Sequence, residues 1–102
     1  MEEKDSQSIR IRLDDPVANG EYVNFANIIH SPSEFVIDFG RAVPGRAEIR
    51  IHSRVIMTPL HAKQMLDALA QNVAIFEQKY GPIRTEPGIG SYSSPSGSDQ
   101  SN

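Results

Sequence analysis

The stretch TPLHAKQMLDALAQNVAIFEQKYG, residues 58–81, decides the fold, because it contains both the start and the stop signals of one long helix. Thr58 is a favourable N-cap, and Pro59 suits the first helical position, where the backbone N–H has no helical partner in any case. Gly81 can adopt the left-handed conformation that closes a helix, and Pro82 prevents its continuation. The sequence therefore predicts a single long helix between these two sets of capping residues.

Apolar side chains recur along this helix at alternating steps of four and three residues, which places them on one stripe. The stripe consists of Ala62, Leu66, Leu69, Val73, Phe76 and Tyr80. We expect it to cover one face of a sheet, so that truncation of Leu69 to alanine costs about 2–5 kcal/mol of folding free energy. Met65, Ala68 and Ile75 form a second apolar row beside the stripe. This surplus favours a homo-oligomer, although the row could also simply widen the surface that faces the core.

Four segments before the helix show the alternation of apolar and polar residues that is typical of strands. They are residues 8–13, 22–30, 34–39 and 46–57. The loops between them contain turn residues, such as Asn19-Gly20 and Ser31-Pro32-Ser33. Short turns favour antiparallel neighbours. The sequence thus predicts an α+β fold: a four-stranded antiparallel meander, followed by one long C-terminal helix packed on one face of the sheet.

The second of these segments is apolar on both faces, and Val23, Phe25 and Ile29 lie on the more apolar of the two. A strand of this kind is usually covered on one side by its own helix and on the other by a partner. This is a second argument for self-association. The candidate residues for an interaction surface are Val23, Phe25, Ile29, His30, Glu34, Asp38, Met65 and Ile75.

The composition limits the chain of 102 residues to one small domain. Polar flanks predict a disordered N-terminal segment at residues 1–7 and a disordered Gly/Pro/Ser-rich tail at residues 84–102, around a single domain at residues 8–83. A domain of this size often needs oligomerisation to complete its core. The chain has no cysteine, no apolar run long enough for a membrane span and no signal peptide, so we expect a cytoplasmic protein without a membrane partner.

The net charge of −3 comes from the flanks, since residues 9–81 contain eight Lys or Arg and eight Asp or Glu. This balance argues against a protein that binds nucleic acids non-specifically. Four arginines on predicted strands could still form a basic sheet face, namely Arg10, Arg12, Arg50 and Arg54. Nucleic-acid binding through this face is therefore one alternative, and a solvated face with salt bridges to Asp38 and Glu48 is the simpler one.

No pattern of catalytic or metal-binding residues is evident. His30, His52 and His61 are not spaced as metal ligands, and the chain lacks both a phosphate-binding glycine loop and a nucleophile motif. Asp38 lies in an apolar strand, where we expect an arginine of a neighbouring strand to be its partner. We therefore predict no catalytic residues, no metal and no cofactor. An enzyme or metal site assembled across a subunit interface from the three histidines and Asp38 is a further alternative.

A set of short motifs through most of the predicted domain resembles a known family. They are Y-x-N at residues 22–24, HSP-x-EF-x-x-DFG at residues 30–40, TP-x-HAK at residues 58–63 and YG at residues 80–81. The family consists of short prokaryotic proteins with a domain of unknown function, and we expect this protein to be bacterial. The resemblance implies a small α+β domain and carries no assigned activity, cofactor or catalytic residue.

These observations together favour a non-enzymatic, homo-oligomeric module that presents a sheet face or edge to another protein or peptide. A sharper version is a peptide-binding chaperone, because a four-stranded antiparallel sheet followed by an assembling helix is similar, in topology alone, to the export chaperone SecB. The interface enzyme and the nucleic-acid binder are the two hypotheses from other functional classes.

Overall fold

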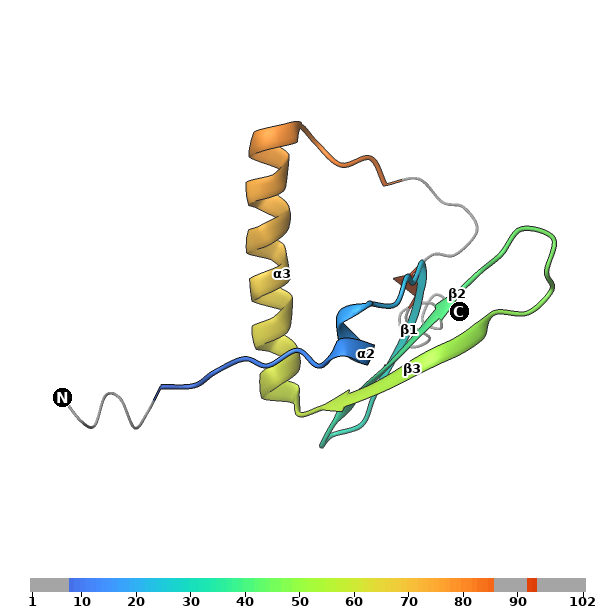
Figure 1. The fold of residues 1–102 in the computed structure, drawn as a ribbon, viewed down its shortest axis with the longest axis horizontal. Coiled ribbons are helices and arrows are strands. Elements are labelled where there is room, and N and C mark those ends of the chain that lie inside the picture. Colours follow the sequence, from blue (N-terminus) through green and yellow to red (C-terminus); the bar gives the residue numbers. More distant parts are fainter. Residues whose placement is uncertain (1–7, 86–91, 94–102) are drawn as a thin grey trace.

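The computed structural model describes residues 8–85 and 92–93, and the structural statements below concern this part of the chain. In chain order its elements are α2 (Asp15–Ala18), β1 (Phe25–His30), β2 (Phe35–Arg41), β3 (Arg50–Met57), α3 (Pro59–Tyr80) and β4 (Tyr92–Ser93) (Figure 1). An antiparallel sheet followed by a long helix confirms the predicted α+β class. The predicted disordered segments fall almost entirely outside the described residues.

The sheet has the strand order β3-β2-β1-β4. β1 pairs with β2, and β2 with β3, in antiparallel fashion, whereas the two-residue β4 lies parallel to β1. The prediction of a four-stranded antiparallel meander is therefore wrong, because the antiparallel part has three strands. The predicted strand at residues 8–13 is absent. Its apolar side chains, Ile9 and Ile11, are 88% and 95% exposed, since alternation alone supplies no neighbouring strand to pair with.

The register defines the two faces of the sheet. Ile28 lies opposite Ile37, and Ile37 lies opposite Val55, so these side chains share one face, which we call the groove face. Ile29 lies opposite Val36 on the other face, which we call the far face. Phe25 is four residues before Ile29 and therefore also lies on the far face.

One irregularity interrupts β3. Phe39 pairs with Ser53, but its neighbour Gly40 pairs with Ile51, so that His52 is skipped by the register. A bulge of this kind reverses the alternation of side chains on the strand that contains it. As a result Arg54 lies opposite Asp38, whereas Arg50 lies opposite Arg41 on the groove face. The predicted regular alternation of residues 46–57 does not hold, and the strand itself begins only at Arg50.

The long helix has the predicted boundaries. The Thr58 hydroxyl oxygen accepts a hydrogen bond from the backbone N–H of His61 at 3.2 Å, as expected of an N-cap. At the other end Gly81 has a φ of 99°, and its N–H donates to the carbonyl of Glu77 at 2.9 Å. A second, four-residue helix, α2, occupies part of the segment 14–21 that the sequence pattern assigns to a loop.

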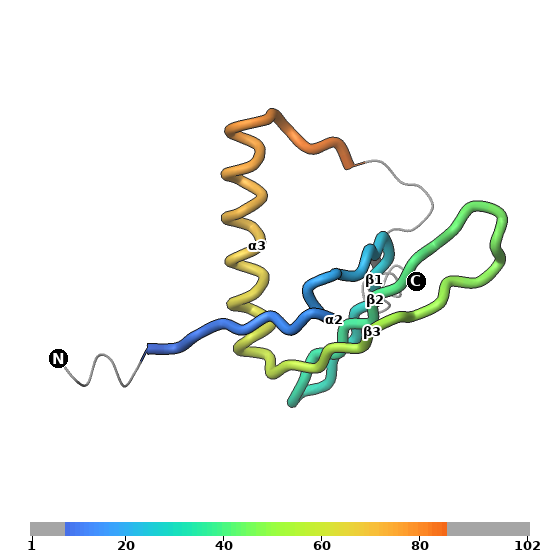
Figure 2. Tube along the Cα trace, viewed as in Figure 1, coloured from blue at the N-terminus to red at the C-terminus, as the bar shows by residue number. Residues whose placement is uncertain are grey.

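The helix does not cover the sheet as predicted. α3 leaves the end of β3 and runs away from the strands, in both the ribbon and the Cα trace (Figures 1 and 2). None of its 22 residues is buried, and Leu66 and Leu69 are 62% and 59% exposed. The buried apolar side chains of the described residues are limited to Ala26, Ile37 and Ala42. A single copy of the chain thus leaves the apolar stripe of its main helix in water.

Two further features of the fold concern the edge of the sheet and the apolar character of the helices. β3 has β2 on one side and, among the described residues, no strand on the other, so its eight residues form an edge of the sheet. None of the described helices is both long enough and apolar enough to span a membrane.

Candidate functional site

An apolar groove lies between the first half of α3 and the groove face of the sheet. Its volume is about 500 Å³. The residues that line it are Ile28, Phe35, Ile37, Pro59, Ala62, Lys63, Met65, Leu66 and Leu69. β1 and β2 supply its floor, and three turns of α3 supply one wall. Since almost every side chain in it is apolar, the groove is suited to an apolar surface of another polypeptide rather than to a polar metabolite.

The structure distributes the predicted apolar candidates over both faces of the sheet. Met65 lines the groove. Phe25 and Ile29 lie on the far face, and Val23 is a half-buried residue just before β1. Ile75 lies farther along α3, outside the groove, and is 61% exposed. The sequence did not single out Ile28 or Leu66 as interaction residues, although Leu66 belongs to the predicted helix stripe.

The polar candidates lie at the β1–β2 turn and in the sheet. The imidazole of His30 stacks on the Phe35 ring directly opposite, with ring centroids 5.4 Å apart. Glu34 closes the turn, because its backbone N–H donates to Ser31 Oγ and its carbonyl accepts from the Ser31 N–H. His30 and Glu34 thus belong to a compact turn.

Asp38 pairs with Arg54 across the strands. The Nε and Nη2 atoms of Arg54 donate to the two carboxylate oxygens of Asp38, at 2.6 and 2.9 Å. Asp38 is 7% exposed, while the arginine side chain lies largely in solvent. Hydrogen bonding to Arg54 lowers the pKa of Asp38 below its ordinary value. The structure therefore gives Asp38 a charge partner of the kind expected from its place in an apolar strand.

The four arginines of the predicted basic face are not brought together. Arg10 and Arg12 lie in the irregular segment before α2, where Arg12 approaches Asp14 at 3.4 Å. The bulge at His52 separates Arg50 from Arg54, because it sends them to opposite faces of the sheet.

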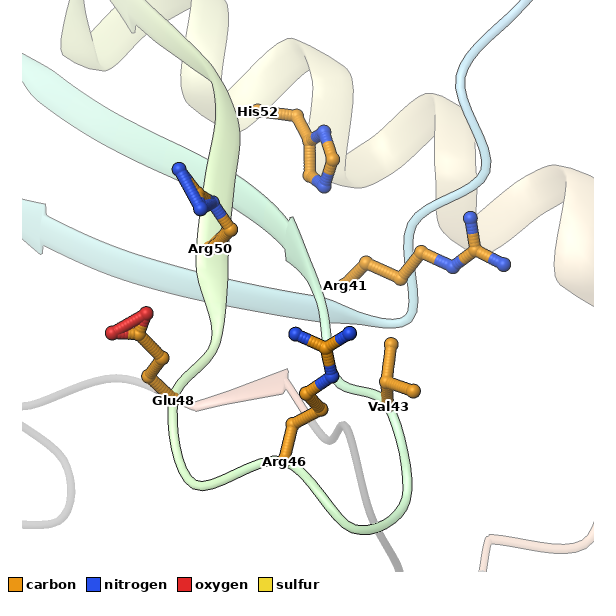
Figure 3. Close-up of a pocket in the computed structure, with 6 residues that line it drawn as sticks. All are labelled: Arg41, Val43, Arg46, Glu48, Arg50 and His52. Atoms are coloured by element: carbon orange, nitrogen blue, oxygen red, sulfur yellow. The ribbon is translucent and has the colours of Figure 1, made fainter.

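A different set of arginines gathers at the end of the β2–β3 hairpin. Here a cavity of about 270 Å³ is lined by Arg41, Val43, Arg46, Glu48, Arg50 and His52, which we call the arginine cluster (Figure 3). Arg46 extends from the loop toward the centre of the group, and the ring of His52 turns toward it from β3 (Figure 3). Arg41 extends to one side, and Arg50 and Glu48 lie at the other (Figure 3).

The loop before β1 orients two of these side chains. The guanidinium of Arg41 lies over the ring of Tyr22, 5.4 Å from its centroid, which is a cation–π contact. The Nδ1 atom of His52 lies 3.2 Å from a carboxylate oxygen of Glu21. Arg46 and Arg50 make no ion pair within the described part of the chain. The cluster therefore holds two guanidiniums without a carboxylate partner in residues 8–85 and 92–93, and a third that lies over an aromatic ring.

The sequence pattern did not identify this cluster, since Arg41 lies in the loop expected between the third and fourth predicted strands, whereas Arg46 begins the predicted strand 46–57. Their proximity depends on the hairpin, which sets Arg41 directly opposite Arg50. A signal was nevertheless present, because the short segment 41–50 contains three arginines and only one carboxylate.

The three histidines lie on different elements: His30 at the end of β1, His52 in β3 and His61 in the first turn of α3. Across residues 8–85 no group of three or more His, Asp or Glu side chains is placed to hold a metal ion. A site of the kind considered for a subunit interface would need a second chain.

Comparison with known proteins identifies the family and nothing more specific. Residues 1–85 match the family described as Protein of unknown function (DUF3467). The match covers most of the chain, so the protein belongs to this family, and the predicted resemblance to a family of unknown function is confirmed. Neither a search of curated proteins nor a search of solved structures found a match.

Proposed function

We propose that the protein is a non-enzymatic, homo-oligomeric interaction module, in which a second copy of the chain fills the apolar groove. The observation that carries this proposal is the exposure of α3, a helix of 22 residues of which none is buried. Helices in proteins obtain most of their stability from packing an apolar face rather than from intrinsic propensity. A helix that exposes Leu66, Leu69 and Phe76 therefore needs a covering surface.

A second copy of the chain can cover both the α3 wall and the sheet floor of the groove at once. In a twofold dimer each surface meets its own counterpart, so one contact covers the helix stripe and the groove face of both chains. The arrangement we propose places the two α3 helices side by side between the two sheets. The chain needs this second copy because its own buried core is small: Ile37 is the only large apolar side chain buried among the described residues.

The area available is of the size that a stable dimer requires. At ~1.5 Å per residue and ~10 Å across, the 22 residues of α3 present roughly 330 Å² in projection. The groove face of the three-stranded sheet adds an area of the same order. Together they approach the ~800 Å² per partner that specific interfaces bury.

The dimer would leave two surfaces for another protein. One is the far face of the sheet, with Phe25 and Ile29. The other is the edge of β3 that has no neighbouring strand among the described residues, where an extended peptide could add as a further strand. This is the interaction part of the proposal. We place the protein in the cytoplasm, where a chain without cysteine has no need of disulfides.

The first experiment is the solution mass of the full chain by light scattering, for the wild type and two variants. We expect a dimer or a higher even oligomer for the wild type, dissociation in Leu69→Asp, and an unchanged mass in Gln71→Asp. Both substitutions introduce the same charge on α3, but Leu69 lines the groove and Gln71 does not. A monomeric wild type across the micromolar range would contradict the proposal, and so would equal masses for the two variants.

Introduced cysteines provide an independent readout, because the natural chain has none. Three single-cysteine variants test this, namely Met65→Cys, Leu66→Cys and Leu69→Cys. In the proposed dimer at least one of them should form a disulfide between copies under mild oxidation. A cysteine at Gln71 is the matched control and should stay monomeric on a non-reducing gel.

The peptide-binding chaperone predicts a different pattern. There the folded chain would be monomeric, or its oligomer would leave the groove open, and an environment-sensitive dye would bind to it with a signal that Leu69→Asp removes. If a folded monomer binds the dye, the groove is open in solution, and its occupant is an apolar peptide rather than a second copy of the chain.

A further inference from the structure

The arginine cluster at the β2–β3 hairpin has no role in the proposed dimer, and its geometry is unusual for a purely structural feature. Arg41 and Arg50 lie directly opposite each other in the register of the two strands. Like charges in this position are destabilising. Farther along the same strand pair, Asp38 lies opposite Arg54 and makes two hydrogen bonds with it. The same hairpin therefore contains one pair of opposite charges, Asp38 and Arg54, and one pair of like charges, Arg41 and Arg50.

The loop that joins the strands adds a third guanidinium to this pair. Arg46 reaches into the space between the strands, where the ring of His52 faces it (Figure 3). Within the described residues, neither Arg46 nor Arg50 has a carboxylate partner, although Glu48 lies at the rim of the same cavity. Arg41 and Arg50 extend to opposite sides of Arg46 (Figure 3), and an anion in the cavity between them would offset the repulsion among the three positive charges, so the arrangement favours a negatively charged ligand.

From this geometry we propose that the arginine cluster binds the phosphate group of a small phosphomonoester or of inorganic phosphate. A phosphate dianion offers three terminal oxygens, and the planar guanidinium fork is suited to bind two of them at a time. Three guanidiniums supply more donors than a single carboxylate can accept. The cavity of about 270 Å³ lies near the lower limit of small-molecule pockets, which suits one phosphate group with a small substituent.

The loop before β1 contacts two side chains of the arginine cluster in the absence of a ligand. The Arg41 guanidinium lies over the ring of Tyr22, and Glu21 contacts His52, so each of these two side chains has a neighbour that favours one orientation. Preorganisation of this kind reduces the entropy that binding would otherwise cost. The balanced charge of residues 9–81 favours an isolated phosphate group over a long nucleic acid, which needs an extended basic surface.

The test is calorimetric titration of the full chain with three probes at constant ionic strength: inorganic phosphate, phenyl phosphate and acetate. We expect saturable binding of at least one phosphate probe with a dissociation constant in the millimolar range or below. The stronger of the two phosphate probes identifies the source, the free ion or a monoester. Absence of saturable phosphate binding overturns the proposal, and so does acetate binding of equal strength.

Matched variants locate the site. Arg46→Gln and Arg50→Gln should each weaken phosphate binding about 10- to 100-fold, because each removes a charge-assisted hydrogen bond. Arg12→Gln makes the same charge change at an exposed position outside the cluster and should leave binding unchanged. Glu48→Gln should strengthen binding, because it removes the carboxylate at the rim. Equal affinities in Arg46→Gln, Arg50→Gln and Arg12→Gln would place the phosphate elsewhere. The dimer experiments do not depend on these arginines, so the two proposals can fail separately.

Discussion

Asp38 and Arg54 lie directly opposite each other in β2 and β3, and both carboxylate oxygens of the aspartate accept hydrogen bonds from the one guanidinium. The carboxylate is buried on the sheet, while the arginine side chain that covers it is largely exposed. This pair fixes the register of the two strands just before the bulge, because a slip by one residue would leave a buried charge without its partner.

The pair makes stability depend on pH in the acid range. Hydrogen bonding to Arg54 lowers the pKa of Asp38 in the folded state. The stabilisation is therefore complete above the pKa of the unfolded carboxyl, about 3.9, and is lost as the pH falls through the lower folded value. We expect urea midpoints of the wild type to decline below about pH 4. Arg54→Gln should be less stable at pH 7 and should show a smaller decline in acid, and an identical acid decline in both proteins would contradict this account.

Asn24 extends the sheet beyond the end of β1 through its side chain. Its amide nitrogen donates to the carbonyl of Ala42 at 3.1 Å, and its amide oxygen accepts from the Ala42 N–H at 2.8 Å. Asn24→Ala should lower the free energy of unfolding by about 1–3 kcal/mol, because both backbone groups of Ala42 lose their partner. Asn27→Ala is a control in the adjoining strand β1, at a half-buried side chain without a hydrogen bond among the described residues. Urea denaturation should show a clearly smaller loss for Asn27→Ala, and equal losses would exclude the proposed role of the Asn24 amide.

Gly40 is required for space rather than for backbone conformation. A Cβ atom at this position would lie 2.6 Å from the backbone carbonyl oxygen of Arg50 and 3.2 Å from side-chain atoms of Ile49 and Ile51. Gly40→Ala should therefore cost about 1–3 kcal/mol in thermal or urea unfolding, through displacement of the bulged strand. Adding Ile51→Ala should not restore stability, because the closest contact is with the main chain. Recovery in the double variant would locate the clash in the side chain instead.

The N-cap of α3 offers a local test of helix stability. Thr58→Ala removes the acceptor for the His61 N–H and should cost about 0.5–2 kcal/mol, whereas Thr58→Ser retains the hydroxyl and should cost much less. Circular dichroism in urea measures both. Similar losses in the two variants would mean that the methyl group, and not the hydroxyl, contributes to stability.

Truncation of Leu69 distinguishes the single copy from the assembly. In one copy Leu69 is 59% exposed, so Leu69→Ala should cost far less than the 2–5 kcal/mol of a buried leucine. In the proposed dimer the full cost should appear, and the melting temperature should rise with protein concentration. A small loss that is independent of concentration would favour the monomer.

The parts of the fold that the sequence predicted well are those with local signals. Thr58, Pro59 and Gly81 determine the ends of α3 within a few residues, and the second to fourth predicted strands overlap β1, β2 and β3. The resemblance to a family of unknown function was also confirmed.

The parts that were wrong or missed depend on contacts that a local pattern does not contain. The alternation at Ile9 and Ile11 resembles a strand, but pairing needs a neighbour, and the segment has none among the described residues. The apolar stripe of α3 is real, but the pattern does not say whether the chain itself or another molecule covers it. The arginine cluster was missed because the bulge at His52, invisible in the alternation, determines which arginines meet.

The outer edge of β3, which has no neighbouring strand among the described residues, carries a risk of aggregation. The outward backbone groups of this eight-residue strand, beside the exposed side chains of Ile51, Val55 and Ile56, form a template to which other extended chains can add. Arg50 and Arg54 interrupt this stretch with charge and act as gatekeepers against such stacking. Arg50→Gln, which breaks no ion pair among the described residues, should therefore reduce the yield of protein that stays in solution during refolding. Arg50 and Arg54 would then limit aggregation during folding, in addition to their contacts in the folded protein.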